Sequence, residues 1–124
     1  QRRLGRLAVD LGASLVLGHH PHVLQGFEVY RGGLIAYSLG NFAFGSYSTR
    51  AKDSVILLVE CDRSGPRTAW LHPVNVYNRE VAFQTRLRTG SDAARVLADI
   101  QRYSNPFGLV LRHEGDRGLI TIRP

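Results

Sequence analysis

The first 18 residues combine three patterns that constrain the fold more than any other part of the chain. Leucine and alanine recur at helical spacing in residues 3–11, and Gly12 follows at a position where a helix can end. Residues 14–18, Ser-Leu-Val-Leu-Gly, are a short apolar run closed by glycine, which is typical of a strand buried on both faces. A helix, a glycine turn and a buried strand in this order predict half of an α/β unit.

The middle of the chain predicts several more strands. Two β-rich arms flank Arg31-Gly32-Gly33, and the double glycine suits a hairpin turn that needs positive φ. Residues 41–54 mix aromatic side chains with Gly, Ser and Thr, which predicts a poorly ordered loop beside a site. Residues 54–61, 68–78 and 80–88 are apolar or partly alternating, so we expect three further strands there.

The last third of the chain predicts a helix and then a hairpin. Ser91 could cap a helix from residue 92 to about residue 103, and Pro106 lies just beyond its expected end. The tail predicts a short hairpin around Glu114-Gly115-Asp116. The helical positions expected on or near the inner face are Ala94, Leu97, Ala98 and Ile100.

The size and composition of the chain exclude several classes of protein. Its 124 residues suit one domain, and no apolar run reaches the roughly 20 residues that a transmembrane helix needs. The net charge is +6 and all but one of the 16 basic residues are arginine, but they are scattered, so we expect no nucleic-acid binding. Cys61 is the only cysteine, which excludes an internal disulfide, and we expect its thiol to be buried and unreactive.

The start of the chain predicts that it is a piece of a longer protein. It begins without methionine and within a helical pattern, and it has no charged start leading into a signal-type apolar segment. We expect it to be the carboxyl-terminal part, with any targeting segment lying upstream.

Three histidines directly after the first strand are the strongest candidates for chemistry. His19, His20 and His22 follow Gly18, and α/β folds place their ligand-binding residues just beyond the carboxyl ends of strands. Proline disfavours the helical region for the residue before it, so His20-Pro21-His22 is predicted to be extended, with both imidazoles on one side and Cα atoms roughly 6.6 Å apart. Two such rings can bind one ion or two adjacent ions. His19 would then point elsewhere, toward substrate or a neighbouring loop.

Two imidazoles do not complete a metal site. A catalytic zinc ion normally has three protein ligands, and dinuclear centres need more. The nearby acids are Glu28, which we expect to face solvent, and Asp53, so the other ligands must come from elsewhere. The alternative is that the histidines are hydrogen-bonded structural residues of a loop without any ion.

Asn41 is the other candidate near a strand end. It follows Gly40, where a carboxamide could orient a ligand histidine or line a pocket. A loop-stabilising Asx turn explains the same residue equally well. His72 and His113 lie in a strand-like stretch and in the tail, and we expect neither to be catalytic.

Residues 12–45, GASLVLGHHPHVLQGFEVYRGGLIAYSLGNFAFG, resemble the carboxyl-terminal hallmark of the CapA family of bacterial capsule or poly-γ-glutamate biosynthesis proteins. The helix before this stretch and the strands after it follow the order of the family, whereas no motif matches beyond about residue 105. The resemblance implies an α/β (α+β) fold: the carboxyl-terminal half of a metallophosphatase-like two-sheet sandwich flanked by helices. Residues 1–124 would then be a single-domain fragment of a CapA-like, calcineurin-like domain whose amino-terminal half is absent.

The resemblance also implies the chemistry of the histidine loop. In such folds a late Gly-His-x-His element supplies metal ligands, and here His22 together with His20 or His19 would take that role. The complete protein would bind a dinuclear divalent metal, Mn, Fe or Zn, and hydrolyse a phosphoester, with the histidine that does not bind metal protonating the leaving group. Asn41 would orient a ligand from behind. The segment alone is expected to be inactive, and it need not contain metal by itself.

Two other functions remain open at the level of sequence. The chain could be a non-catalytic accessory subunit that binds an anionic capsule polymer or an export partner, which its arginine excess also fits. It could instead act as an assembly module that forms homo-oligomers through a surface meant for the missing half. By resemblance the protein is bacterial and is membrane-associated or extracytoplasmic.

Overall fold

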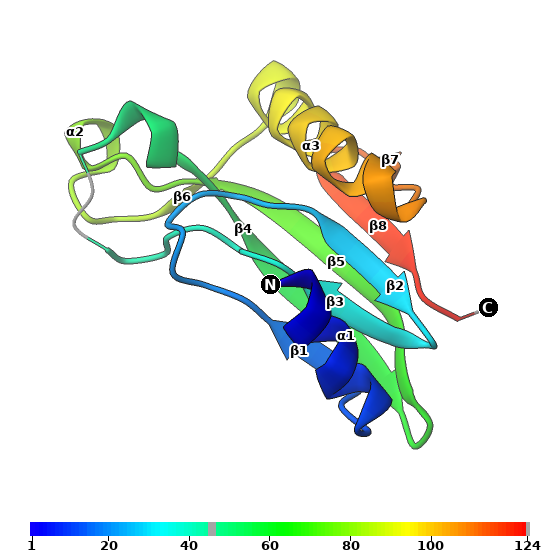
Figure 1. Cartoon of the computed structure of the whole chain (residues 1–124). Helices are drawn as coiled ribbons and strands as arrows, with labels where there is room; N and C mark the ends of the chain where they lie inside the picture. Colours follow the sequence, from blue (N-terminus) through cyan, green and yellow to red (C-terminus); the bar gives the residue numbers. More distant parts are fainter. Residues whose placement is uncertain (45–46, 124) are drawn as a thin grey trace.

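Two β-sheets packed against each other, with helices around them, form the chain in the computed structural model (Figure 1). The structure describes residues 1–44 and 47–123, so residues 45–46 of the predicted loop lie outside the described part. The small sheet has the order β1-β3-β2, and the large sheet has the order β4-β5-β8-β7 with β6 paired to β5. This arrangement confirms the predicted mixed α/β class with two sheets.

The bounds of the elements follow the chain order. The helices are α1 (Arg2–Asp10), α2 (Asn78–Val81) and α3 (Gly90–Ser104), with 3-10 turns at Thr49–Ala51 and Asn105–Phe107. The strands of the small sheet are β1 (Leu15–Leu17), β2 (Phe27–Tyr30) and β3 (Gly33–Ala36). Those of the large sheet are β4 (Asp53–Asp62), β5 (Gly65–Asn75), β6 (Arg86–Leu87), β7 (Arg112–Glu114) and β8 (Arg117–Thr121). No helix in the described part of the chain is long and apolar enough to cross a membrane.

The core lies between the two sheets and is closed on one side by α3. Phe27 and Leu34 of the small sheet share one apolar cluster with Leu71 of the large sheet and Leu97 of α3. The predicted inner face of α3 is wrong at Ala94 and Ala98, which are exposed. The helix begins at Gly90, and its N-cap is Thr89 instead of the predicted Ser91. A different set of positions therefore faces the core. These buried positions are Ala93, Val96, Leu97, Ile100 and Ser104.

Helix α1 forms where predicted, but it packs through a glycine and not through its leucines. Gly5 is its one buried residue among those described, and a Cβ there would lie 3.1 Å from Cγ2 of Ile35. Glu28 was expected to face solvent, but it is 3% exposed because its carboxylate accepts hydrogen bonds from Arg6 of α1 and from the hydroxyl of Tyr37. Burial, and then the hydrogen bond to Glu28, raises the pKa of Tyr37 to about 12. This cluster fastens α1 to β2.

Strand β1 also forms where predicted, but it is not buried on both faces. It pairs in parallel with β3 and with no other described strand, so it lies at the edge of the small sheet. Leu15 and Leu17 are 36% and 49% exposed for this reason. The apolar run is that of an interior strand, whereas its position in the described structure is that of an edge strand.

Both predicted hairpins, around residues 31–33 and 114–116, are confirmed. β2 and β3 are antiparallel around a turn in which Arg31 and Gly32 have φ of 49° and 80°. Gly33 is favoured by packing instead, because a Cβ there would lie 3.1 Å from Val9 and 3.2 Å from the carbonyl oxygen of Ser14, which is a tight fit. β7 and β8 form the tail hairpin.

The expected third strand at residues 80–88 is largely wrong. Strands β4 and β5 form as predicted, but the chain then enters α2, and only β6 returns to the large sheet. Ala82 and Phe83 have φ of 47° and 64°, which ends any extended ladder, and the amide of Phe83 donates to the side chain of Asn78.

The prediction for Cys61 is also wrong. Its thiol is exposed, and Cys61 lies close to the turn of the β4–β5 hairpin, just after a register shift at Glu60.

Candidate functional site

The histidine loop, residues 18–22, begins where β1 ends. The amide of Gly18 donates to the carbonyl of Ala36 at 2.7 Å, so the loop starts tight against β3. A Cβ on Gly18 would lie 2.2 Å from the carbonyl oxygen of Tyr37, so a larger residue could not follow this path. The fold therefore places the three histidines at a strand end, as the sequence predicts.

The backbone of the loop is not extended as we expected. His20 and His22 have φ of 88° and 61°, both in a region that non-glycine residues seldom adopt. Such conformations cost on the order of 1–3 kcal/mol each and cluster at sites that bind ligands. The bend, and not an extended alternation, sets the positions of the rings. Their centroids are 6.3 Å apart and the ring planes are inclined at 45°.

His22 makes the most specific contact of the loop. Its Nδ1 lies 2.7 Å from Oδ1 of Asn41. Because this amide oxygen can only accept, Nδ1 carries the hydrogen and the lone pair of the neutral ring is on Nε2. The ring also stacks on Phe44, with centroids 4.7 Å apart. His22 is exposed, so a fixed tautomer with an available Nε2 faces outward from the loop.

Asn41 is buried behind this ring and is itself only partly satisfied. It is 5% exposed, and its Nδ2 has no hydrogen-bond acceptor among the described residues. Leaving such a donor unpaired costs about 1–3 kcal/mol. Gly40, with φ of 81°, brings the chain so close to β4 that a Cβ there would lie 2.9 Å from Oγ of Ser54. Asn41 thus has the position of a residue that orients His22.

His19 has different surroundings from His20 and His22. Together with Asn41 it lines a cavity of about 250 Å³, whose other wall is the start of β4, from Ser54 to Leu57. His20 is not among the residues that line this cavity. The three histidines therefore comprise a ring pair, His20 and His22, and a third histidine at a cavity that Asn41, the partner of His22, also lines.

The nearby acids do not complete a metal site. Among residues 1–44 and 47–123 no group of three or more His, Cys, Asp or Glu side chains is placed to hold an ion. Glu28 is engaged beneath α1, and Asp53 pairs with Arg88 at 2.7 Å and Arg95 at 2.9 Å. The donor set that the loop offers is imidazole alone, which suits Zn, Fe and similar ions as part of a larger site.

The other two histidines lie on the large sheet. His72 is in β5 and lines a separate cavity of about 160 Å³ with Arg88 and Asp116. His113 is in β7. Neither residue lines the cavity next to the histidine loop.

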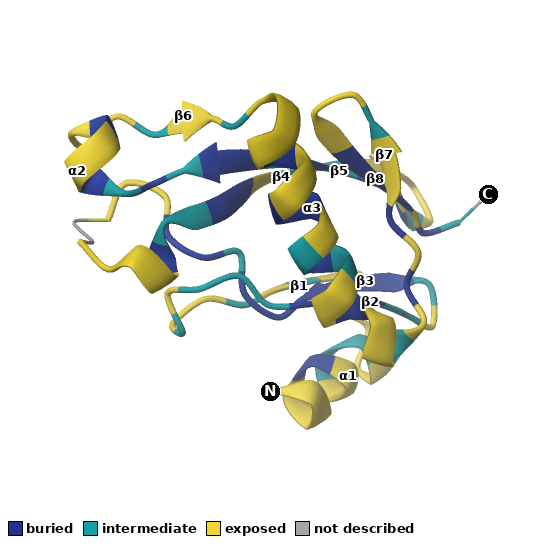
Figure 2. Cartoon of the chain, turned by 90° about the horizontal axis from the view of Figure 1, so that it is seen from above, coloured by how far each residue is buried: buried dark blue, intermediate teal, exposed yellow. Residues whose placement is uncertain are grey.

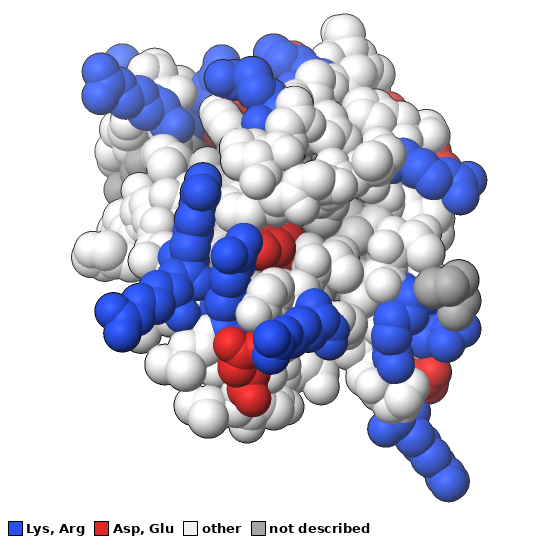
Figure 3. All heavy atoms as spheres, turned by 45° about the vertical axis from the view of Figure 1, so that its right-hand side comes forward, with Lys and Arg blue, Asp and Glu red and all other residues white. Residues whose placement is uncertain are grey.

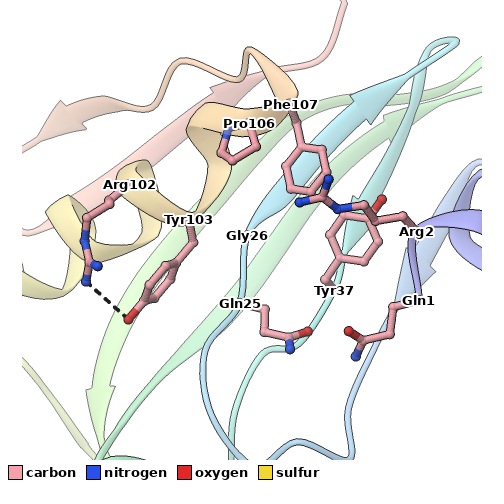
Figure 4. A pocket seen from close by; sticks show the side chains of 9 residues that line it. All are labelled: Gln1, Arg2, Gln25, Gly26, Tyr37, Arg102, Tyr103, Pro106 and Phe107. Atoms are coloured by element: carbon pink, nitrogen blue, oxygen red, sulfur yellow. Dashed lines mark hydrogen bonds between the residues drawn. The ribbon is translucent and has the colours of Figure 1, made fainter.

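A cavity of about 410 Å³ lies between the start of α1, the residues before β2 and the end of α3 (Figure 4). Its walls are aromatic: Tyr37 stacks on Phe107 at 5.0 Å, and Arg2 lies over Phe107 at 4.6 Å. Arg102 is engaged with Asp99 at 2.7 Å. Among the described residues no histidine or carboxylate lines this cavity, so we do not assign the hydrolytic chemistry to it.

The fold and the loop define a mixed α/β segment in which a glycine-led histidine loop, supported by an asparagine, follows a parallel strand. Residues 1–46, which contain α1, the histidine loop and Asn41, match the family model described as bacterial capsule synthesis protein PGA_cap. Over these residues the chain is similar to the CapA family of bacterial capsule synthesis proteins, which confirms the resemblance noted for residues 12–45.

Curated relatives support the same resemblance. The chain is 45% identical over 76 residues to the capsule biosynthesis protein CapA of Bacillus anthracis, and the match covers 61% of this chain and 18% of that protein. It is 42% identical over 77 residues to the PGA biosynthesis protein CapA of Bacillus subtilis (strain 168), covering 62% and 20%. An uncharacterized protein of Sinorhizobium fredii is 43% identical over 49 residues, covering 40% and 11%. The match thus spans about a fifth of the length of the two CapA proteins.

Proposed function

We propose that this chain supplies the histidine loop of a metal-dependent phosphoesterase-type hydrolase that acts in capsule or poly-γ-glutamate biosynthesis. The observation that carries the proposal is the 2.7 Å contact between His22 and Asn41, which leaves Nε2 of an exposed histidine free to bind a metal. The family match supports the link to capsule synthesis. The hydrolytic activity is the part that we propose here and that the experiments below test.

The metal site of the complete protein is divided between this loop and residues elsewhere. His22 and His20 are the ligands from this chain, and carboxylates or further histidines outside it supply the rest of a dinuclear Mn, Fe or Zn centre. When bound, such ions lower the pKa of a bound water toward about 7 and hold phosphate oxygens. We place this chemistry in a bacterial protein at the membrane or outside the cytoplasm, since a capsule lies outside the cell.

The side chains of this chain have separate tasks in the proposed reaction. Asn41 accepts from Nδ1 of His22 and keeps Nε2 directed outward. The unpaired Nδ2 of Asn41 is a donor for an oxygen of the substrate or of a bound water. His19, which lines the cavity, is the general acid that gives its proton to the leaving oxygen.

Hydrolysis of an aryl phosphate by the complete protein, supplied in turn with Mn, Zn and Fe, tests the activity. We expect metal-dependent turnover that His22→Ala lowers at least about 100-fold. Losing a ligand weakens metal binding, and without the metal there is no activated water. His113→Ala is the matched control, since it removes an imidazole from β7, and turnover should stay unchanged. Turnover that persists in His22→Ala with metal still bound would refute the assignment.

A second function, non-catalytic binding of an anionic polymer, has its own support in the charge of the chain. The net charge is +6, and basic side chains project in several separate groups from the face shown in Figure 3. Three arginines outnumber the one carboxylate around a surface hollow, which is lined by Arg2, Arg3, Arg6, Leu7, Asp10 and Tyr30. Attraction between exposed charges is screened within about 8–10 Å at physiological salt.

Binding of poly-γ-glutamate at low and at high salt separates the two functions. The accessory function predicts binding without added metal that is lost in high salt and is unaffected by His22→Ala. The hydrolase predicts that His22→Ala abolishes turnover at either salt concentration. Binding that survives high salt and needs the metal would count against the accessory function.

A further inference from the structure

We propose that the cavity beside the histidine loop receives an apolar group of the substrate, so that the hydrolase acts on the phosphate ester of an apolar alcohol. The cavity measures about 250 Å³, and His19 and Asn41 join it to the histidine loop. This inference rests on the hydrolase proposed above, and it adds the class of alcohol to which the phosphate is esterified.

The walls of the cavity consist mainly of apolar side chains. They come from the segment after β3 and from the start of β4, and they are Leu39, Phe42, Val55, Ile56 and Leu57. No carboxylate, lysine or arginine of a described residue lines the cavity. Such walls favour an alkyl or aryl group, which gains free energy on leaving water, over a group with several hydroxyls, which would lose its hydrogen bonds to water.

The polar atoms at the cavity are mostly occupied within the chain. The hydroxyl of Ser54 donates to the carbonyl of Leu39, and Oδ1 of Asn41 is held by His22. The imidazole of His19 and the unpaired Nδ2 of Asn41 remain, and both belong to the histidine loop or to its partner. A substrate would therefore place its ester oxygens at this end of the cavity and its apolar atoms along β4.

The start of β4 provides a fixed wall for the cavity. The amide of Val55 donates to the carbonyl of Leu39 at 3.3 Å, which joins the segment after β3 to β4. Burial along β4 is greatest near this start and falls toward the other end of the strand (Figure 2). Leu57 packs against the core, whereas Ile56 and Phe42 are 41% and 59% exposed. The cavity thus combines walls held by the core with two exposed apolar side chains that an incoming group can contact.

The volume of the cavity suits a ring or a short alkyl chain. An engineered cavity of about 150 Å³ with similar apolar walls binds benzene. The cavity here is larger, at about 250 Å³. Sites for drug-sized ligands measure roughly 300–1,000 Å³, so a single ring or a chain of several carbons is the expected occupant.

Hydrolysis of hexyl phosphate and of glycerol 1-phosphate by the complete, metal-loaded protein is the first test. Both esters have an alkyl oxygen as leaving group, and they differ in the polarity of the alcohol. We expect kcat/KM to be at least about 10-fold higher for hexyl phosphate, since a single methylene in an apolar pocket already changes kcat/KM by roughly 10-fold or more. Equal values for the two esters would overturn the proposal.

A pair of variants on β4 locates the preference. Ile56→Asp should lower kcat/KM for hexyl phosphate at least about 10-fold and leave that for glycerol 1-phosphate unchanged. Leu58→Asp is the matched control, because Leu58 lies two residues further on the same face of β4, is 55% exposed and does not line the cavity. It should change neither value. A preference that survives Ile56→Asp would contradict this cavity as the site of the apolar group.

Binding of hexylphosphonate, which has no ester bond to hydrolyse, gives a readout apart from turnover. In methyl NMR spectra of the complete protein, hexylphosphonate should shift the signal of Ile56 and methylphosphonate should not. Ile35, which is buried in β3 and does not line the cavity, is the internal control. An Ile56 signal that stays in place overturns the apolar site even if the protein is a hydrolase. An Ile56 signal that moves in a protein that hydrolyses neither ester overturns the hydrolase but not the apolar site.

Discussion

At the scale of single residues, one hydrogen bond decides which nitrogen of His22 can bind a metal. Oδ1 of Asn41 lies 2.7 Å from Nδ1 of His22, and Phe44, three residues after Asn41, stacks on the His22 ring. The sequence alone predicts the presence of Asn41 at a strand end, but two roles fit it equally well. Only the fold brings residue 41 to residue 22, because β2 and β3 fold back and return the chain to the end of β1.

Replacing Asn41 by Ala tests this role. We expect zinc affinity of the complete protein to fall by about 10–100-fold, as is usual when the partner of a ligating histidine is lost. The nitrogen chemical shifts of His22 should also change, since the wild-type ring carries its hydrogen on Nδ1 and the variant ring is free to carry it on Nε2. A wild-type ring already protonated on Nε2, or an affinity unchanged by Asn41→Ala, would remove Asn41 from the site.

The buried pair of Glu28 and Tyr37, which Arg6 joins from the surface, makes the stability of the chain fall at alkaline pH. The pKa of Tyr37 is raised to about 12, above the ordinary value of 10, so the folded state favours the neutral phenol. This stabilisation is present below pH 10 and is lost as the pH rises toward 12. We expect the free energy of unfolding to fall by about 2 kcal/mol over that range.

The Tyr37→Phe variant provides the comparison. It has no hydroxyl to titrate, so its free energy of unfolding should fall less between pH 10 and pH 12. Urea unfolding at several pH values measures both proteins. Equal losses in the two proteins would show that Tyr37 does not cause the dependence.

At the scale of helices and strands, local patterns predict which elements exist better than they predict what those elements bury. The first helix, the strand after it, both hairpins and α3 all form near their predicted positions. Residues 80–88 do not form the predicted strand, because left-handed conformations at Ala82 and Phe83 override a sequence that looks β-rich. In α3 the start at Gly90 shifts the buried stripe, so Ala93 is buried where Ala94 was expected.

Adjacent alanines in α3 give a matched test of the observed register. Ala93 is completely buried, whereas Ala94 is exposed. We expect Ala93→Glu to lower the free energy of unfolding by several kcal/mol or to prevent folding, since an unpaired charge would enter the core. Ala94→Glu should change it by no more than about 0.5 kcal/mol. Urea denaturation of the two variants measures both values, and the reverse order would contradict this register of α3.

At the scale of the whole molecule, the sequence predicts the family and the class of fold, because its distinctive residues are contiguous. Residues 12–45 carry the resemblance, and the family model matches residues 1–46. The environment of Glu28, Cys61 and Leu17 is not predictable from local pattern, since it depends on what packs against each residue. Glu28 pairs with Arg6 of α1 and is buried, whereas Cys61 and Leu17 are exposed. Among the described residues the histidine loop offers imidazoles without a neighbouring carboxylate, so the sequence and the fold together specify at most part of the proposed metal site.

Metal content of the complete protein, with and without His22→Ala, tests the central claim most directly. After supply of Mn, Zn and Fe and removal of free ions, we expect near-stoichiometric metal in the wild type and a clear loss in His22→Ala, with His113→Ala unchanged. A folded wild-type protein that stays empty with all three metals, or a His22→Ala variant that keeps its full content, would contradict the assignment of a metal site to the histidine loop.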